Sequence, residues 1–506
     1  MTLVILPPEV LHNIFKWLDP ADIVILPRVC PVLYTFTKGN KTLSRAVYLR
    51  HFDKPTDLNL DWYVELCDLV HLQMICERGD AATKKPQLDF VYDVVNRCLS
   101  HASPRPGPPS VDRTHASSAN VDFLSNLFHD ESNLEAFLQR SFLFERARSE
   151  LHHPIRASVI GSSKALLHQR SAKLHCLYGR PLLRFGPTRA SRTYPFACSK
   201  VYDLRQYTDR THWGPFLDDG SNSVDWEKVE AILIVLGKNI GTRCTVTNFF
   251  KENWDDAFSG SWPGSYSTLP GPELTSLELQ DPYDVTGTWF RIVCFLDYND
   301  FFSYNFPVGD LLTEDTPRPA LDVGEATRLL QMQLHIDKIE PPGPNDGQDL
   351  PVVHFRGVTR SLDDSFDGGG NSDMRGTVRL TQEGEVRWTT FSIFNGQERW
   401  RSEGIQVGGV RSARGVVGNW FDKDYDAHGP AGPSAFWKGP MGKVERVGDH
   451  MLPVDFFETH GVNVDEVQLQ VPILTPADAE RIFEGVRPGE LPSFMRDQGA
   501  VQNHSS

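Results

Sequence analysis

The first fifty residues show the hydrophobic spacing of short helices. Apolar residues recur every three or four positions over residues 6–18, which places them along one side of a helix. The dipeptide Asp19-Pro20 ends this helix and starts a second, because Asp is a favoured N-cap and Pro a favoured first helical residue. A third helix is predicted from Arg28 onward. The pattern therefore predicts a small trihelical unit over residues 1–52.

Residues 53–192 continue in a mostly helical pattern and are predicted to form a helical linker region. Apolar stripes with helical spacing occur at 62–70, 90–98 and 123–128. The segment 101–120 is instead rich in Pro, Ser and Gly, which predicts a disordered loop.

From about Tyr194 the pattern changes to short β-type runs separated by Gly, Pro, Asn and Asp. The predicted strands are two within 286–306 joined at 297–300, one at 352–358, and a hairpin of 377–380 with 385–394 that turns at Glu383-Gly384. One helix, residues 226–236 with Asp225 as its cap, interrupts them. A closing helix is predicted at 476–483, and the loops 340–350 and 361–373 are expected to be mobile.

Many short strands without alternating helices favour an antiparallel barrel or sandwich over a parallel sheet. We assign this β-barrel-like domain to residues 193–485 and a flexible tail to 486–506. The predicted fold class is an α+β multidomain protein with an N-terminal trihelical unit, a helical middle region and a C-terminal antiparallel β-barrel-like domain.

Composition excludes several classes of function. The 506 residues carry a net charge of -15, which argues against general nucleic-acid binding, because phosphate backbones are held by clustered Lys and Arg. The chain lacks the long apolar run that a bilayer span or a signal peptide needs, so we expect a soluble protein of the cytoplasm or nucleus. Its eight cysteines are scattered without a C-x-x-C pair. We predict no metal site, no cofactor and no catalytic constellation.

The N-terminal motif is specific. It consists of Leu6-Pro7-Pro8-Glu9-Val10-Leu11, Ile14-Phe15, Leu18-Asp19-Pro20, Asp22-Ile23, Leu26 and Arg28-Val29-Cys30. This run resembles an F-box. The resemblance implies docking onto a Skp-type adaptor and, through it, a Cullin scaffold. It assigns adaptor contact to an apolar face with Glu9 and Arg28 near its rim: Leu6, Pro7, Glu9, Val10, Ile14, Leu26, Arg28 and Val29.

The F-box resemblance has two departures. Leu33-Tyr34 stands where the family commonly has a Trp, and Ser44 follows Leu43 where another Trp is usual. A trihelical unit of this size cannot enclose all its apolar side chains, so a surplus is expected to face a partner.

A second resemblance covers more of the chain. The runs 387–389, 392–396, 398–400, 402–409, 415–421 and 426–433 together resemble the C-terminal barrel of a fungal F-box family. They are also similar to animal F-box receptors whose barrel takes up C-terminal tails of substrates. The resemblance implies that the β domain binds the substrate.

Two groups of residues in this region are candidates for substrate contact. Arg411 and Arg414 lie in a Gly-rich loop that could hold a carboxylate or phosphate, or that could be a structural turn. Four tryptophans could line a peptide groove or form the barrel core: Trp388, Trp400, Trp420 and Trp437.

The functional hypothesis is a non-catalytic substrate receptor of a Skp-Cullin-F-box ubiquitin ligase, in which the barrel binds an unidentified target protein. Two alternatives remain open. The barrel could instead bind a small molecule or hydrolyse a substrate, or the chain could bind the adaptor as a scaffold outside a ligase.

Overall fold

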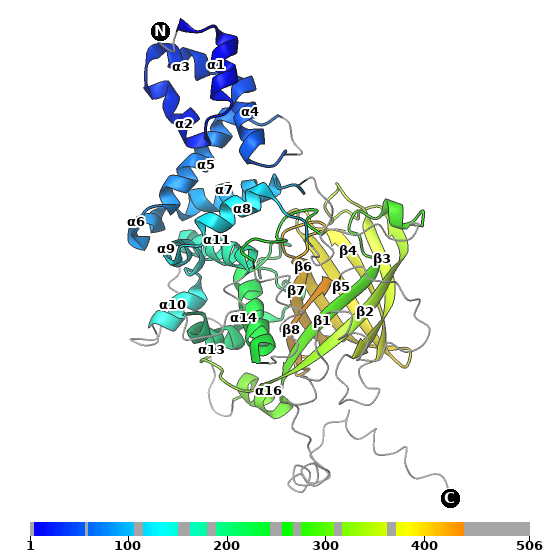
Figure 1. Cartoon of the computed structure of the whole chain (residues 1–506). Helices are drawn as coiled ribbons and strands as arrows, with labels where there is room; N and C mark the ends of the chain where they lie inside the picture. The colour runs from blue at the N-terminus through cyan, green and yellow to red at the C-terminus, as the bar shows by residue number, and fades with distance from the viewer. Residues whose placement is uncertain are drawn as a thin grey trace, which may run out of the picture. The chain divides into compact units, whose positions relative to one another are not determined.

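The computed structural model describes residues 5–55, 59–105, 115–149, 162–179, 189–242, 256–266, 275–307, 316–361 and 371–439. Its N-terminal unit consists of α1 (Pro8–Phe15), α2 (Pro20–Ile25), α3 (Pro31–Thr37) and α4 (Lys41–His51) (Figure 1). Proline begins the first three helices because its missing N–H costs nothing in a first turn. The predicted trihelical unit is confirmed, with its third helix starting at Pro31 and α4 added after it.

The helical middle region follows. It contains α5 (Trp62–Cys76), α6 (Ala81–Lys84), α7 (Leu88–Ser100), α8 (Ala119–Leu127), α9 (Glu131–Asn133), α10 (Phe142–Ser149), α11 (Ser162–Tyr178), α13 (Arg189–Tyr202) and α14 (Trp226–Thr242). The predicted helix with Asp225 as its cap is α14, and the Asp225 carboxylate accepts the Lys228 N–H at 3.2 Å. α14 is buried along most of its length and packs on β1, β7 and β8 of the barrel.

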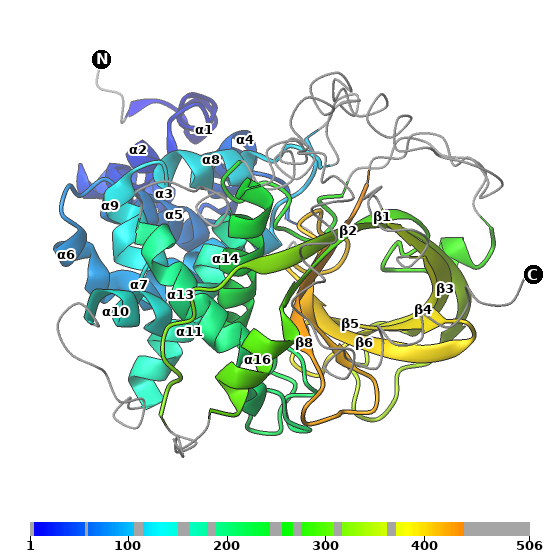
Figure 2. The ribbon, with the colours of Figure 1, turned by 90° about the horizontal axis from the view of Figure 1, so that it is seen from below.

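The C-terminal part is a closed antiparallel barrel in which each strand pairs with the next and β1 pairs with β8 (Figure 2). Its strands are β1 (Gly287–Leu296), β2 (Glu325–Glu340), β3 (Val352–Ser361), β4 (Ser372–Leu380), β5 (Val386–Phe394), β6 (Gln397–Gln406), β7 (Val416–Asp422) and β8 (Ala431–Lys438). Closure leaves no sheet edge exposed. The predicted antiparallel barrel and the β4–β5 hairpin are confirmed.

One predicted strand is wrong. The segment after β1 forms the helix α16 (Tyr298–Asn305), with the Asp297 carboxylate capping it by accepting the Asn299 N–H at 2.8 Å. Phe301 and Asn305, four residues apart, are buried on one side of this helix. The aromatic residues that suggested a strand therefore lie on a helix. The Asp297 cap favours the helix over the strand.

The predicted change to β-type runs at Tyr194 is also wrong. Residues from Tyr194 lie in α13 and later in α14, which pack on each other, and the first barrel strand begins at Gly287. Burial of Ala197, Cys198 and Val201 in α13 outweighs the local turn-like composition. The exact domain boundaries stay predictions.

Two loops differ from expectation where they are described. Residues 115–117 of the segment predicted to be disordered are hydrogen-bonded, since Ala116 donates to Ser265 at 2.8 Å. The predicted mobile loop 340–350 is held to β4 by the Gly347 N–H, which donates to Leu380 at 2.8 Å. Residues 106–114 and 362–370 lie outside the described residues.

Residues Met1–Gly448 form one compact unit, and Asp449–Ser506 are assigned to a second. The second unit, with the predicted closing helix and tail, lies outside the described residues. In the part of the chain that is described, every helix is too short or too polar to cross a bilayer.

Candidate functional site

The N-terminal unit exposes a concentrated apolar face. Half of the large exposed hydrophobic side chains of the described residues lie between positions 5 and 34, namely Ile5, Val10, Ile14, Trp17, Ile25, Val29, Val32 and Tyr34. Single exposed apolar residues are common on any protein, whereas a cluster of this kind marks an interaction site. We call these residues the apolar face.

This face rests on a closed core. Leu11, Phe15, Ile23 and Leu33 are buried beneath it, and the rings of Phe15 and Phe36 meet edge to face at 5.7 Å. The exposed side chains are thus surplus to the core, as expected for a unit of this size.

The predicted adaptor-binding residues all lie at the surface. Leu6 and Leu26 are half-buried, and the other six are exposed: Pro7, Glu9, Val10, Ile14, Arg28 and Val29. Their contact with an adaptor stays a prediction.

Five further residues of the face were not among the predicted adaptor contacts: Ile5, Trp17, Ile25, Val32 and Tyr34. Trp17 is 63% exposed, and the Arg50 guanidinium lies over its ring at 4.4 Å. A lone Trp in the short link after α1 was the signal that could have identified it.

One end of the barrel interior is filled by a hydrophobic core. Trp289 and Trp388 meet at 5.1 Å, and Phe436 packs on both. Aliphatic and aromatic side chains from β1 to β5, β7 and β8 complete this cluster. Large side chains therefore close the barrel near the start of β1.

The next layer of the interior is polar. Arg291 follows Trp289 on the inner face of β1 and is 4% exposed. Its Nε donates to the Ser434 hydroxyl at 2.9 Å, and its Nη2 donates to Ser402 across the barrel. Among the described residues no carboxylate pairs with it, and burial alone lowers the pKa of Arg291 to about 10.

A charged guanidinium that donates only to hydroxyl groups is suited to bind a hydrogen-bond acceptor supplied by a ligand. Arginine presents several N–H donors in a fixed plane that matches a carboxylate or phosphate. The barrel wall excludes much of the water that would weaken such a contact. The Arg291 layer is therefore the best candidate for polar recognition inside the barrel.

Two tryptophans lie beyond this layer, toward the other end of the barrel. Trp400 and Trp420 are half-buried and meet edge to face at 5.2 Å. Trp420 lies against Gly432, since a Cβ added at Gly432 would stand 2.9 Å from the Trp420 Nε1. The Trp420 Nε1–H donates to the Cys294 carbonyl at 3.0 Å. Trp400 and Trp420 thus place half-buried aromatic surface at this end of the barrel, which we call the mouth.

A second arginine occupies the same end. Arg328 pairs in register with Val293, which places it on the inner face of β2, and its guanidinium lies over the Phe295 ring at 5.4 Å. Arg328 is half-buried, so it is nearer to solvent than Arg291. The inner surface thus combines aromatic rings at its mouth with arginines at two depths.

The other predicted substrate residues occupy structural positions. Trp388 is in the hydrophobic core, and Trp437 is 1% exposed on the side of β8 opposite the interior residue Phe436. Neither is accessible to a substrate in this structure. Of the four predicted tryptophans, the structure brings Trp400 and Trp420 together and separates the other two from them.

The predicted anion-binding loop is not built around two free arginines. Arg414 is fully buried, and its Nη2 donates to the carbonyls of Tyr178 at 3.1 Å and Asp256 at 2.9 Å. Burial lowers the pKa of Arg414 to about 9. Arg411 is exposed and lies 3.9 Å from an Asp284 oxygen. The structural-turn alternative fits Arg414, which links β7 to the helical region.

The outer wall of the barrel carries a buried ion-pair network. Glu403 is fully buried and accepts from Arg387 at 2.8 Å, from Arg401 and from the Thr389 hydroxyl. Burial alone would raise the pKa of Glu403, but the two guanidiniums outweigh this effect, and its pKa is lowered. Gly214 packs over this network, since a Cβ at Gly214 would stand 2.9 Å from the Glu403 Cβ.

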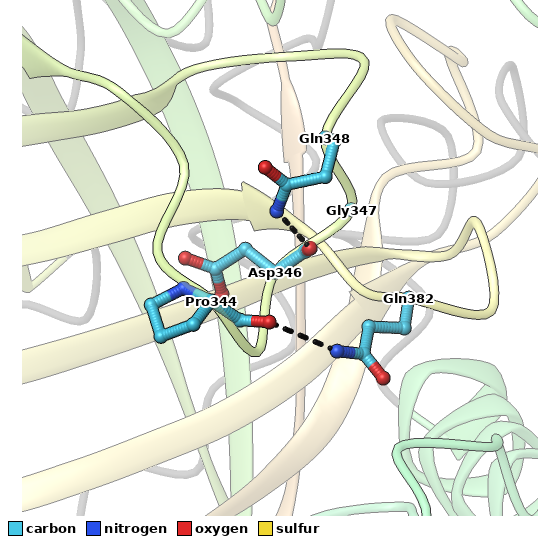
Figure 3. Close-up of a pocket in the computed structure, with 5 residues that line it drawn as sticks. All are labelled: Pro344, Asp346, Gly347, Gln348 and Gln382. Atoms are coloured by element: carbon cyan, nitrogen blue, oxygen red, sulfur yellow. Dashed lines mark hydrogen bonds between the residues drawn. The ribbon is translucent and has the colours of Figure 1, made fainter.

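A surface hollow of about 330 Å³ lies at the closed end of the barrel (Figure 3). It is lined by Pro344, Asp346, Gly347, Gln348 and Gln382. The two glutamine amides donate to the carbonyls of Asp346 at 2.8 Å and Pro344 at 3.1 Å, respectively. Because its polar groups bind one another, this hollow is a weak candidate for a ligand site.

The described residues contain no group of three or more His, Cys, Asp or Glu side chains arranged to hold a metal ion. Glu325 at the start of β2 has a pKa raised by burial, yet its oxygens accept from Tyr194 at 2.6 Å, from Asn239 at 2.7 Å and from Tyr202. Internal donors thus engage this carboxylate.

Comparison with protein families gives a match at the N-terminus. Residues 3–50 match the family described as F-box-like, and this range contains the whole apolar face. The chain therefore has an F-box-like domain at its N-terminus. Comparison of the chain with curated proteins and with solved structures gave no significant match.

Proposed function

We propose that this chain is the substrate-recognition subunit of a Skp-Cullin-F-box ubiquitin ligase. The observation that carries the proposal is the apolar face, which lies on the F-box-like domain and has no covering element among the described residues. A Skp-type adaptor would bury this face. The Cullin scaffold would join through the adaptor.

The adaptor interaction can be tested with Ile14→Asp combined with Val29→Asp. These side chains are 40% and 64% exposed, so their replacement leaves the core intact. Burying unpaired charges in the interface costs several kcal/mol, and every ~1.4 kcal/mol weakens binding tenfold. We expect calorimetric titration with a purified Skp-type adaptor to show at least about 100-fold weaker binding.

The matched control is Leu279→Asp, because Leu279 is also an exposed apolar residue, at 71%, but lies outside the F-box-like domain. The control should bind the adaptor like the parent chain. Equal adaptor affinity of the double variant and the parent would contradict the assignment.

The barrel is the proposed substrate-binding domain. A protein segment entering past Trp400 and Trp420 would meet Arg328 and then Arg291 in the interior. Aromatic side chains and arginine dominate peptide recognition, and a terminal carboxylate is a natural partner of a buried guanidinium. This arrangement supports uptake of a substrate C-terminal tail, in agreement with the resemblance to tail-binding receptors.

In this proposal the chain forms no covalent bond itself. It raises the effective concentration of a substrate lysine near a ubiquitin-conjugating enzyme that other subunits supply. The engaged oxygens of Glu325 and the self-bonded hollow at the closed end give little support to a hydrolytic barrel. A scaffold outside a ligase is distinguished by whether Cullin accompanies the adaptor.

A further inference from the structure

The helix α16 exposes a row of aromatic side chains. Tyr298, Phe302 and Phe306 recur every four residues and are 37%, 39% and 37% exposed. Their ring centroids follow one another at 6.0 Å and 4.8 Å. Aromatic rings bury much apolar area, so a continuous exposed row is unfavourable unless a partner covers it.

The row continues onto a second element. His428, in the connection between β7 and β8, lies 4.8 Å from the Phe306 ring and 6.4 Å from the Phe302 ring. We call Tyr298, Phe302, Phe306 and His428 the aromatic row. It joins two segments of chain that both leave the same end of the barrel.

The opposite side of α16 is firmly held. Phe301 is buried against Tyr202 at 6.4 Å, and the Asn305 amide donates to the Tyr202 carbonyl at 3.0 Å. Tyr304 donates to the Ser199 hydroxyl at 2.8 Å. The aromatic row is therefore a fixed surface, and little conformational entropy is lost when a partner binds it.

The charges around the row are mostly negative. Asp297 directly precedes Tyr298 and is exposed. An oxygen of Asp426, which is also exposed, lies 3.8 Å from Nδ1 of His428. Lys423 is paired with Asp424 in the same connection. Carboxylates next to aromatic faces favour cationic side chains, which gain both ion pairs and cation–π contacts. The chemistry of the surface thus selects a basic partner segment.

The C-terminal segment of the chain and a second copy of it match this surface poorly. Residues 440–506 contain five Lys and Arg against eleven Asp and Glu, and the whole chain carries a net charge of -15. Charge therefore opposes both the C-terminal segment and a second copy as occupants.

The row also lies at the barrel end proposed to admit substrate. β1 leads into α16 through Asp297, and Trp400 pairs in register with Asp422, just before the connection that carries His428. A substrate segment that follows a tail held in the interior would leave the barrel at this end.

We propose that the aromatic row docks a basic segment of the substrate, so that recognition involves both a tail and an Arg- or Lys-rich stretch next to it. This inference rests on the proposed function of the barrel as a substrate-binding domain. It specifies that the substrate carries a basic stretch next to its tail.

The test uses fluorescence anisotropy with the full chain and a labelled twelve-residue peptide of alternating Arg and Gly. The matched peptide replaces each Arg with Glu. We expect the chain to bind the Arg peptide, and Phe302→Ser combined with Phe306→Ser to weaken binding about tenfold, as expected from the loss of two cation–π contacts. Asp297→Asn with Asp426→Asn should also weaken binding of the Arg peptide, and added salt should reduce the difference from the parent.

The control variant Leu279→Ser removes an apolar side chain elsewhere that is even more exposed, at 71%, and should bind the Arg peptide like the parent. Equal affinity of the parent and the double serine variant would overturn the inference, as would preference for the Glu peptide. If the parent chain forms a dimer and the double serine variant does not, the row binds a second copy of the chain. That result would also overturn the inference.

Adaptor binding by the same preparations separates this inference from the proposed function. If the Arg peptide fails to bind while the adaptor still binds, the inference fails and the receptor proposal stands. If adaptor binding and tail capture are absent while the row binds the Arg peptide, the receptor proposal fails instead.

Discussion

Replacing Arg291 with Met should separate barrel stability from barrel function. The pKa of Arg291 falls from 12.5 to about 10 through burial, which corresponds to about 3 kcal/mol against the charged folded form. Arg291→Met removes this cost and keeps most of the side-chain volume. It also leaves the Ser402 and Ser434 hydroxyls without their donor, at roughly 1 kcal/mol each. The net expectation is a gain of about 1 kcal/mol in the free energy of unfolding.

Arg387→Met is the matched control, because Arg387 is an arginine with a buried carboxylate partner. It donates to Glu403 at 2.8 Å, and Glu403 is fully buried. Removing one partner of a buried ion pair costs about 3–5 kcal/mol, and Arg401 remains to limit the loss to about 3 kcal/mol. The two Arg→Met variants should thus change stability in opposite directions.

Urea unfolding followed by tryptophan fluorescence measures both variants, since Trp289 and Trp388 lie in the barrel core. Capture of a substrate tail should be lost in Arg291→Met and retained in Arg387→Met under conditions where both are folded. A cost in Arg291→Met as large as that in Arg387→Met would refute the reasoning. It would mean that Arg291 is a structural residue with adequate partners, and not a recognition residue retained at the expense of stability.

Two further predictions concern the wall and the mouth of the barrel. The lowered pKa of Glu403 means that its contribution to stability is complete above its ordinary pKa of 4.5 and is lost as pH falls through the folded value. Glu403→Gln should therefore lower the melting temperature at pH 7, and the gap from the parent should narrow below about pH 4.5, as followed by circular dichroism. Trp400→Ala with Trp420→Ala should weaken tail capture by at least about tenfold, because half-buried aromatic anchors carry much of such binding. The adaptor affinity of this double variant should match that of the parent. Unchanged tail capture in calorimetry would contradict the role of Trp400 and Trp420.

Local sequence signals predicted the elements that depend on neighbouring residues. Pro20 after Asp19 marked the start of α2, and Gly384 marked the β4–β5 turn, where its φ is 86°. The same approach misread α16, since Phe and Tyr favour strands when their tertiary contacts are unknown. Asp297 was the overlooked signal, because a capping carboxylate before the aromatic residues favours a helix.

The interior of the barrel depends on contacts that are distant in sequence. Arg291 meets Ser434 and Ser402 only because β1 pairs with β8 and closes the sheet. The available signal was a lone Arg within the otherwise apolar run of β1. Arg414 is the converse case, because its Gly-rich context suggested an anion site, whereas its partners are the carbonyls of Tyr178 and Asp256.

Co-purification of the tagged chain with adaptor and Cullin tests the central proposal most directly. We expect the parent chain to elute in one complex with both proteins, and Ile14→Asp with Val29→Asp to elute without either, while Arg291→Met keeps both. A parent complex that contains the adaptor and no Cullin, or retention of both proteins by the double variant, would contradict the role of substrate receptor in a ligase.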